Sequence, residues 1–204
     1  MSGDEVVLYS NPRSRGRMAH WMLEEVGAPY RVVTFDFAKG EHKAPDFLAI
    51  NPMGKVPAIV HRGTTVTETA AILAYLADAF PDAGLAPATD DPARGSYYRW
   101  LFFGAGCFEP ALADRMFERP PVSNRGALGY GSYEDVLATL KGALSPGPYL
   151  LGERFTAADL YLGALLGFAI QFGAKDVAAE PVFAGYVGRV TGRPAHGRVD
   201  GATA

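Results

Sequence analysis

The spacing of apolar residues divides the first fifty positions into short, alternating elements. The runs EVVLY (5–9) and YRVVTF (30–35) are apolar and β-branched, which is typical of strands. Between them, the segment 15–26 places apolar side chains one turn apart on a single face, and Gly27 follows it as a helix-ending residue. A strand–helix–strand unit of this size implies a parallel pair joined by a right-handed crossover.

The segment from Asn51 to Phe80 predicts a hairpin followed by a helix. The run 56–60 is a strand with Pro57 at its entrance, where the missing N–H costs no ladder bond. Arg62-Gly63 predicts a tight turn into a threonine-rich strand at 64–67. The helix begins at Glu68-Thr69, where a hydroxyl can cap and where the free N–H groups favour anions.

The remainder of the chain shows helical patterns and no strand pattern. The segment 81–92 is polar, proline-rich and unpatterned, which is typical of a linker between domains. The helix at 156–172 is apolar on all sides, so we expect it at the centre of a bundle. The remaining expected elements are a single helical turn at 45–50, helices at 97–117, 133–144 and 181–190, a turn at 194–199, and a loop at 120–131.

These elements predict an α/β domain followed by an all-α domain. The order βαβ, short helix, ββα indicates a mixed sheet with helices on both faces, which is a thioredoxin-like arrangement. An α-helical bundle follows it. The expected division is residues 1–80 for the first domain, 81–91 for the linker and 92–204 for the helical domain.

The start of the central helix carries a capping box. Thr156 precedes the helix and Asp159 stands three positions later, so each is expected to bond the other's backbone N–H. Phe155 comes before the cap and is expected to pack on Leu160. These residues serve folding and not catalysis.

Composition excludes several classes of function. The formal net charge of −3 argues against a general nucleic-acid binder. The single cysteine, Cys107, excludes an internal disulfide and a cysteine-rich metal site, and the four histidines show no ligand spacing, so no metal is expected. The acidic start MSGDEVV predicts no signal peptide, and the longest apolar run, 160–170, is too short for a bilayer, so a cytoplasmic protein is expected.

The hairpin and the helix after it have the features of a site for a small peptide-like ligand. A strand entered through proline leaves the backbone groups of Val56 free to pair with an extended peptide. Glu68 can take an ammonium group, and the helix start at Thr69 can take a carboxylate. A hairpin and a capped helix without any ligand would have the same residue types.

The motif N-P-x-G-K-V-P at 51–57, followed by E-T-x-A-I at 68–72, resembles the glutathione-binding half of the glutathione S-transferase family. The string G-x-x-x-T-x-A-D at 152–159 resembles the box that opens the central helix of that family's second domain. The resemblance implies that Pro57 is cis and that glutathione is the co-substrate. It also implies that the Val56 backbone pairs with the cysteinyl part and that the acidic–hydroxyl pair holds the γ-glutamyl end. The glutathione-binding residues implied are Lys55, Val56, Pro57, Glu68 and Thr69.

The resemblance also implies that a residue just after the first strand donates a hydrogen bond to the glutathione sulfur and lowers its pKa. The segment LYSNPRSR resembles the bacterial-type, theta- and zeta-like classes that use a serine, which favours Ser14. The cysteine of the beta class would fall at Arg15, and the zeta-class serine-cysteine pair is Arg15-Gly16 here, so a maleylacetoacetate-type isomerase is not expected. The alternative for Ser14 is an N-cap serine without ligand. The candidates are Tyr9, Ser10, Asn11, Ser14 and Arg15.

An electrophile pocket is expected between the two domains. A helix face with aromatic side chains three or four residues apart could line it, although the same face suits plain bundle core. A lone helical cysteine is also more often a small core residue. The candidates are Tyr97, Trp100, Phe103 and Cys107.

The sequence therefore predicts a cytosolic glutathione transferase that conjugates the glutathione thiolate to a small apolar electrophile. A homodimer is expected, with no nucleic-acid or membrane partner. Two alternatives stay open. One is a glutathione-dependent isomerase, dehalogenase or ether-cleaving enzyme. The other is a non-catalytic, glutathione-binding regulatory protein of the same fold.

Overall fold

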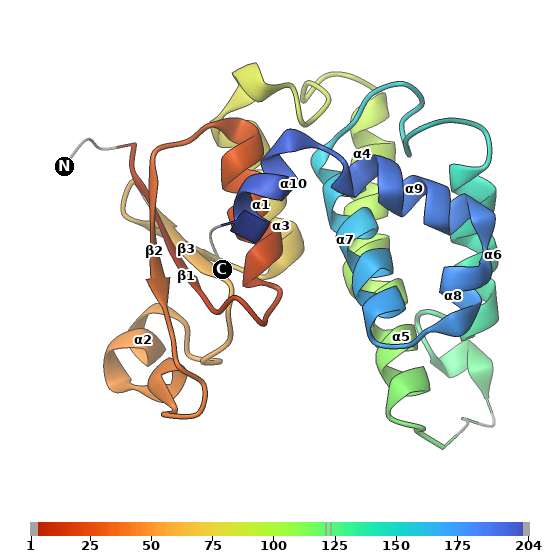
Figure 1. Cartoon of the computed structure of the whole chain (residues 1–204), viewed down its shortest axis with the longest axis horizontal. Helices are drawn as coiled ribbons and strands as arrows, with labels where there is room; N and C mark the ends of the chain where they lie inside the picture. The colour runs from red at the N-terminus through yellow and green to blue at the C-terminus, as the bar shows by residue number, and fades with distance from the viewer. Residues whose placement is uncertain (1–3, 121, 123, 202–204) are drawn as a thin grey trace. The chain divides into compact units, whose positions relative to one another are not determined.

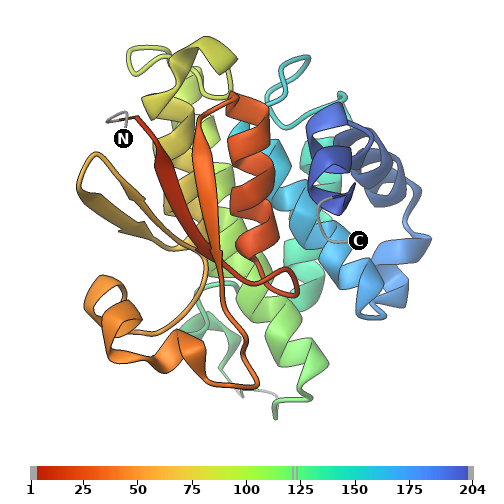
Figure 2. The same ribbon diagram turned by 60° about the vertical axis from the view of Figure 1, so that its left-hand side comes forward.

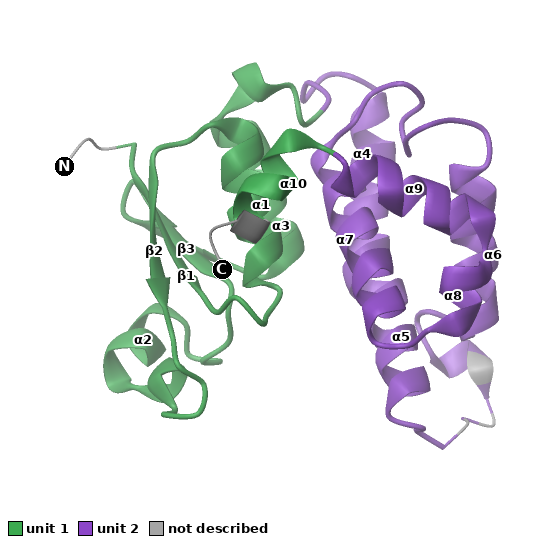
Figure 3. Cartoon of the chain, in the orientation of Figure 1, with its two compact units in different colours: residues 1–86, 193–204 green, residues 87–192 purple. Residues whose placement is uncertain are grey.

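The computed structural model describes residues 4–120, 122 and 124–201 (Figure 1). The chain forms two compact units (Figure 3): residues 1–86 with 193–204, and residues 87–192. The ends 1–3 and 202–204, and residues 121 and 123 of the predicted loop, lie outside the described residues. Each unit has its own core and is described by itself.

The first unit contains a four-stranded mixed sheet. Its strands are β1 (Val6–Ser10), β2 (Tyr30–Thr34), β3 (Ala58–His61) and β4 (Thr64–Thr67), in the order β2-β1-β3-β4. β1 and β2 run parallel, and β3 is antiparallel to both β1 and β4. Burial alternates along β1, because successive side chains of a strand point to opposite faces. This is the mixed sheet that the sequence predicts.

Helices cover both faces of this sheet. α1 (Gly16–Val26) and α3 (Thr69–Ala79) pack side by side against one face, where Leu8 is fully buried (Figure 2). On the other face, Phe47 of α2 (Pro45–Ile50) packs on the rings of Tyr9 and Phe35, with ring centroids 5.5 and 4.5 Å away. The short helix predicted at 45–50 is therefore confirmed.

The predicted hairpin turn and the predicted end of α1 are also confirmed. Arg62 and Gly63 both have positive φ, 49° and 76°, which is the conformation of a type I′ hairpin turn. Gly27 ends α1 in the left-handed region and donates its N–H to the Leu23 carbonyl at 3.0 Å.

The second unit is all helical, with α7 (Ala157–Gln171) at its centre. Ten of the fifteen residues of α7 are buried, as expected for a helix that is apolar on all sides. The predicted helix at 97–117 consists of α4 and α5 joined by a π-helical turn, Gly104–Phe108. The other helices of this unit are α4 (Ala93–Phe103), α5 (Glu109–Met116), α6 (Tyr133–Leu144), α8 (Lys175–Ala179) and α9 (Pro181–Thr191). Short 3-10 helices of the chain occupy Glu41–Lys43, Pro81–Ala83 and Arg125–Ala127.

The capping box of α7 is formed and buried. The Thr156 N–H and hydroxyl both donate to Asp159 Oδ2 at 2.9 Å. The other carboxylate oxygen accepts from the Leu150 N–H at 2.8 Å and from the Tyr186 hydroxyl at 3.0 Å. Thr156 and Asp159 are both fully buried, and so is Leu160, the expected packing partner of Phe155. All four donors around this carboxylate belong to the protein itself.

The last helix, α10 (Pro194–Gly201), packs on α1 of the first unit. The sequence predicts only a turn at 194–199 and places it in the helical domain. That expectation of a turn is wrong, because the segment forms a full helix whose packing partner, α1, is distant in the sequence. Two oxygens of Glu25 accept from Nε and Nη2 of Arg193, each at 2.7 Å, and the Glu25 side chain is only 5% exposed. Arg198 pairs with Glu24, and the rings of His196 and Trp21 meet edge to face at 4.7 Å.

Throughout the described part of the chain, no helix combines the length and the apolar content that crossing a bilayer requires.

Candidate functional site

The strand register brings three segments together at one end of the sheet. Tyr9 pairs with Ala58, and Ala58 pairs with Thr67. The next positions along these strands are Ser10 on β1, Pro57 before β3 and Glu68 after β4. The segment that leads into α1, the proline-entered strand and the start of α3 therefore lie beside one another.

Val56 precedes the paired part of β3 and joins Pro57 through a cis peptide bond, as the family resemblance implies. Its side chain is half-buried. Among the residues that the structure describes, no protein group pairs with its backbone N–H or C=O. Val56 therefore keeps the free backbone groups that an added peptide strand would need.

The start of α3 has no side-chain cap. Glu68 is the N-cap residue, with φ 65° and ψ 120°, and neither its side chain nor that of Thr69 caps the first turn. The expectation that a hydroxyl caps this helix is wrong, because Thr69 is already the first helical residue. Thr69 is 9% exposed, whereas Glu68 is exposed, so the acidic side chain is accessible beside uncapped N–H groups.

The two candidate serines converge on Gly16. The Ser14 hydroxyl donates to the Asn11 carbonyl at 2.7 Å, and its oxygen accepts from the Gly16 N–H at 3.0 Å. Ser10 is 5% exposed. A Cβ added at Gly16 would lie 2.0 Å from the Ser10 hydroxyl oxygen and 3.0 Å from that of Ser14, so only glycine fits between them. Ser14 is half-buried and is the more accessible of the two.

The structure does not bring Tyr9 to this group. Its ring stacks on Phe35 and packs at a tilt on Phe47, on the face opposite to Ser10. Asn11 is tied to Phe35 by a bond from Nδ2 to the backbone oxygen at 2.7 Å. Arg15 is exposed at the N-cap of α1.

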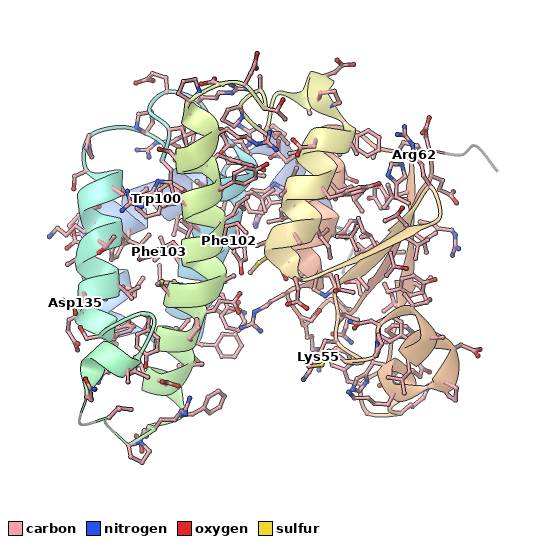
Figure 4. The ribbon with its side chains drawn as sticks, turned by 180° about the vertical axis from the view of Figure 1, so that it is seen from behind. Lys55, Arg62, Trp100, Phe102, Phe103 and Asp135 are labelled. Carbon is pink, nitrogen blue, oxygen red and sulfur yellow. The ribbon has the colours of Figure 1, made fainter. Side chains whose placement is uncertain are left out.

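Two basic side chains belong to or contact the loop 51–55 that leads to Val56, and the sequence predicts only one of them, Lys55, which is exposed (Figure 4). The other is Lys43, whose Nζ donates to the Met53 carbonyl at 2.8 Å. A Cβ at Gly54 would lie 2.8 Å from the His42 carbonyl oxygen, so the 3-10 helix Glu41–Lys43 lies directly against this loop. Such a contact is non-local, and no pattern in the sequence signals it.

The candidate pocket residues of the second unit fall into two pairs. Tyr97 is fully buried and Trp100 is 5% exposed, which favours a role in the core. Phe103 and Cys107 are half-buried and keep part of their surface. Trp100 and Phe103 meet edge to face at 5.4 Å on α4 (Figure 4). The pocket itself stays a prediction.

The titratable groups of the first unit with shifted pKa values lie away from this end of the sheet. Burial lowers the pKa of His61, which is the last residue of β3, and of His20 and His196 on α1 and α10. Burial and the hydrogen bond to Glu24 raise the pKa of Tyr30 to about 12. Within the described ranges, no three His, Cys, Asp or Glu side chains are grouped as a metal site would require.

Comparison with known proteins identifies the family. The model of the glutathione S-transferase N-terminal domain matches residues 4–78. Glutathione S-transferase 3 of Zea mays is 31% identical over 188 residues, which is 85% of this chain and 83% of that protein. The chain belongs to the glutathione S-transferase family. The matched N-terminal domain contains all three segments that meet at the end of the sheet.

Two further comparisons extend the likeness to nearly the whole chain. GstA of Escherichia coli O157:H7 is 29% identical over 189 residues, 92% of this chain and 93% of the relative. A solved sphingomonad glutathione S-transferase, complexed with glutathione, superposes with a TM-score of 0.79 at 34% identity and covers 96% of this chain and 98% of its own. These three matches do not assign a class, so the theta- or zeta-like serine class stays a prediction.

Proposed function

We propose that this chain is a glutathione transferase that conjugates the glutathione thiolate to a small apolar electrophile. One observation carries the proposal. The serine-bearing turn before α1, the unpaired backbone of Val56 and the uncapped start of α3 meet at one end of the sheet. A tripeptide with a thiol, an ammonium group and carboxylates has a complementary group for each of them.

In this proposal the ligand lies as an added strand along Val56. The Val56 N–H and C=O pair with the cysteinyl part of glutathione. Glu68 takes the ammonium of the γ-glutamyl end, and the uncapped N–H groups at Thr69 take its carboxylate. The positive charges of Lys55 and Lys43 lie beside the same loop and favour an anionic ligand.

Ser14 is the proposed activator of the sulfur. A free thiol has a pKa of about 8.5, and lowering it to about 6.5 requires roughly 2.7 kcal/mol of differential stabilisation of the thiolate. One hydroxyl bond to a charged acceptor contributes about 1.5–3 kcal/mol. The Ser14 hydroxyl donates to the Asn11 carbonyl, and rotation about one bond would turn it to a thiolate. The dipole of α1, whose positive end lies at its N-terminus, adds a favourable field.

The thiolate can be observed directly by its ultraviolet absorbance during a pH titration of the glutathione complex. Ser14→Ala should raise the thiol pKa by about one unit or more and lower turnover, with nearly unchanged glutathione affinity. Ser145→Ala is the matched control, because that hydroxyl also donates to a backbone carbonyl, that of Lys141, at 2.7 Å. A Ser14→Ala titration that overlays the wild type would transfer the role to Ser10. A panel of electrophiles, assayed with and without glutathione, tests the activity itself.

We further infer a homodimer in the cytoplasm. Two aromatic side chains on α4 support the dimer, since Phe102 is 72% and Tyr98 40% exposed. The free Cys107 is consistent with a reducing compartment. Sedimentation at micromolar concentration should give twice the chain mass of 21.8 kDa, and a species of 21.8 kDa alone would exclude the dimer.

A further inference from the structure

The side chain of Asn51 holds together the loop that delivers Val56. Asn51 is 4% exposed. Its Nδ2 donates to the Lys55 carbonyl at 2.8 Å, and its Oδ1 accepts from the Met53 N–H at 3.2 Å. Its own carbonyl accepts from the Gly54 N–H at 2.8 Å. One buried residue thus bonds to three successive positions of the five-residue loop 51–55.

The same loop is also fixed from outside. Lys43 bonds to the Met53 carbonyl, and Gly54 has a φ of +57°, in the left-handed region. A side chain at Gly54 would collide with the His42 carbonyl at 2.8 Å. The loop is therefore held in one conformation by bonds and close contacts before any ligand arrives, and such preorganisation favours binding.

The bond from Asn51 to Lys55 has a geometric consequence one atom further along the chain. The Lys55 C=O and the Val56 N–H belong to the same peptide unit, which is planar and trans, so the two groups point in opposite directions. By holding the carbonyl on the inner side of the loop, Asn51 directs the Val56 N–H outward. The described residues offer this N–H no partner.

We propose that Asn51 is a positioning residue for glutathione, which acts through the Lys55–Val56 peptide. The proposal rests on the function proposed above, because the Val56 N–H is the group that pairs with the ligand there. Without the Asn51 amide, this peptide plane is free to rotate, and the N–H loses its fixed direction. The sulfur activator lies on a different segment, so the chemical step keeps its own geometry.

Asn51→Asp is the decisive variant, since it keeps the size and the acceptor oxygen but replaces the donor by an oxygen that repels the Lys55 carbonyl. Loss of one oriented hydrogen bond should raise the calorimetric Kd for glutathione about tenfold. The kcat at saturating glutathione should stay within about twofold, since the lost interaction holds glutathione equally in the ground state and in the transition state. Asn124→Asp is the matched control, because Asn124 is exposed and its Oδ1 accepts from the Gly126 N–H at 3.1 Å. This variant should leave the Kd for glutathione and the kcat unchanged.

Amide hydrogen exchange separates positioning from loss of structure. In the wild type, glutathione should slow the exchange of the Val56 amide, and in Asn51→Asp this protection should disappear. The amides within β3 should stay protected in both proteins. If Asn51→Asp does not fold, Asn51→Ala removes the same donor and should give the same loss of Val56 protection.

A Kd within about twofold of the wild type, or full protection of Val56 in a folded Asn51 variant, would overturn the role of Asn51 alone. A wild-type chain that binds no glutathione would overturn the proposed function together with it.

Discussion

The helices α3 and α7 differ in how the N–H groups of their first turns are satisfied. Each helix begins with N–H groups that have no partner within the helix. At α7, Thr156 and Asp159 form a capping box, and every donor around the carboxylate comes from the protein. At α3, the N-cap residue Glu68 is exposed and makes no capping bond. A helix start that the protein satisfies itself serves folding, whereas one left open is available to a ligand.

The largest effect expected from this comparison is on stability, at α7. Asp159→Ala removes the carboxylate that accepts from the Leu150 N–H, the Thr156 N–H and the Thr156 hydroxyl, whereas the Tyr186 hydroxyl keeps the backbone carbonyl of residue 159 at 3.3 Å. Each such loss costs about 1–3 kcal/mol, so the free energy of unfolding in urea should fall by at least about 3 kcal/mol.

The start of α6 provides the matched control for Asp159. Ser132 and Asp135 have the same spacing and bond to each other at 2.7 Å, but Asp135 lies exposed on α6 (Figure 4). Asp135→Ala should therefore cost under about 1 kcal/mol. Equal losses in the two variants would mean that burial does not distinguish the boxes.

The next effect is on binding, at α3. Glu68→Ala removes an exposed side chain without a capping bond, so the stability should change by less than about 0.5 kcal/mol. Glutathione affinity, measured by calorimetry, should weaken by about 1–3 kcal/mol, because a charge-assisted bond to the ligand ammonium is lost. Glu134→Ala, at an exposed position in the first turn of α6, is the control. Unchanged affinity would remove Glu68 from the site.

The smallest effect concerns an unpaired polar group that lies away from the site. His61 is fully buried at the far end of β3; its Nδ1 bonds to the Tyr75 hydroxyl at 2.9 Å, and its Nε2 has no partner among the described groups. Burial lowers its pKa from the ordinary 6.5. The folded state thus binds the proton more weakly than the unfolded state, and stability present above pH 6.5 is lost as the pH falls through the folded pKa.

Urea unfolding between pH 7 and pH 5 tests this behaviour. Each unit of pKa lowering corresponds to about 1.4 kcal/mol, and the wild type should lose stability over this range. His61→Phe removes the titrating group and keeps a ring to stack on Phe80, so its stability should depend less on pH. Parallel pH profiles of the two proteins would show that His61 does not titrate in this range.

The sequence predicts the fold correctly where residues close in sequence determine the structure. The capping box, the tight turn at Arg62-Gly63 and the helix at 133–144 depend on residues close in sequence, and each is confirmed. The π-helical turn, in contrast, packs against the distant Tyr161, whose ring would lie 2.7 Å from a Cβ at Gly104. The packing of α10 on α1 depends on partners such as Glu25 and Arg193, which lie 168 residues apart. No local pattern contains either fact.

In the candidate site too, the sequence predicts some features, whereas others depend on contacts between distant residues. The residues of the motif at 51–57 and 68–72 meet at one end of the sheet, because strand register follows from the hydrophobic alternation and the hairpin. Alternation alone does not show which face of β1 lies at the candidate site, so the sequence predicts Tyr9 as a candidate together with Ser10 and Ser14. The contributions of Lys43 and Asn51 require knowledge of the loop that they hold.

The packing of α10 on α1 also bears on how the protein is made. A ribosome releases the chain from its first residue onward, and domains generally fold as they emerge. Residues 87–192 are continuous and can fold as soon as they leave the exit tunnel. In contrast, Arg193 and α10 of the first unit emerge only after residues 87–192, so Glu25 lacks its ion-pair partner while the whole second unit is synthesised. A chain shortened at residue 192 would keep every strand of the sheet and still lack α10, the helix that packs on α1 in the first unit.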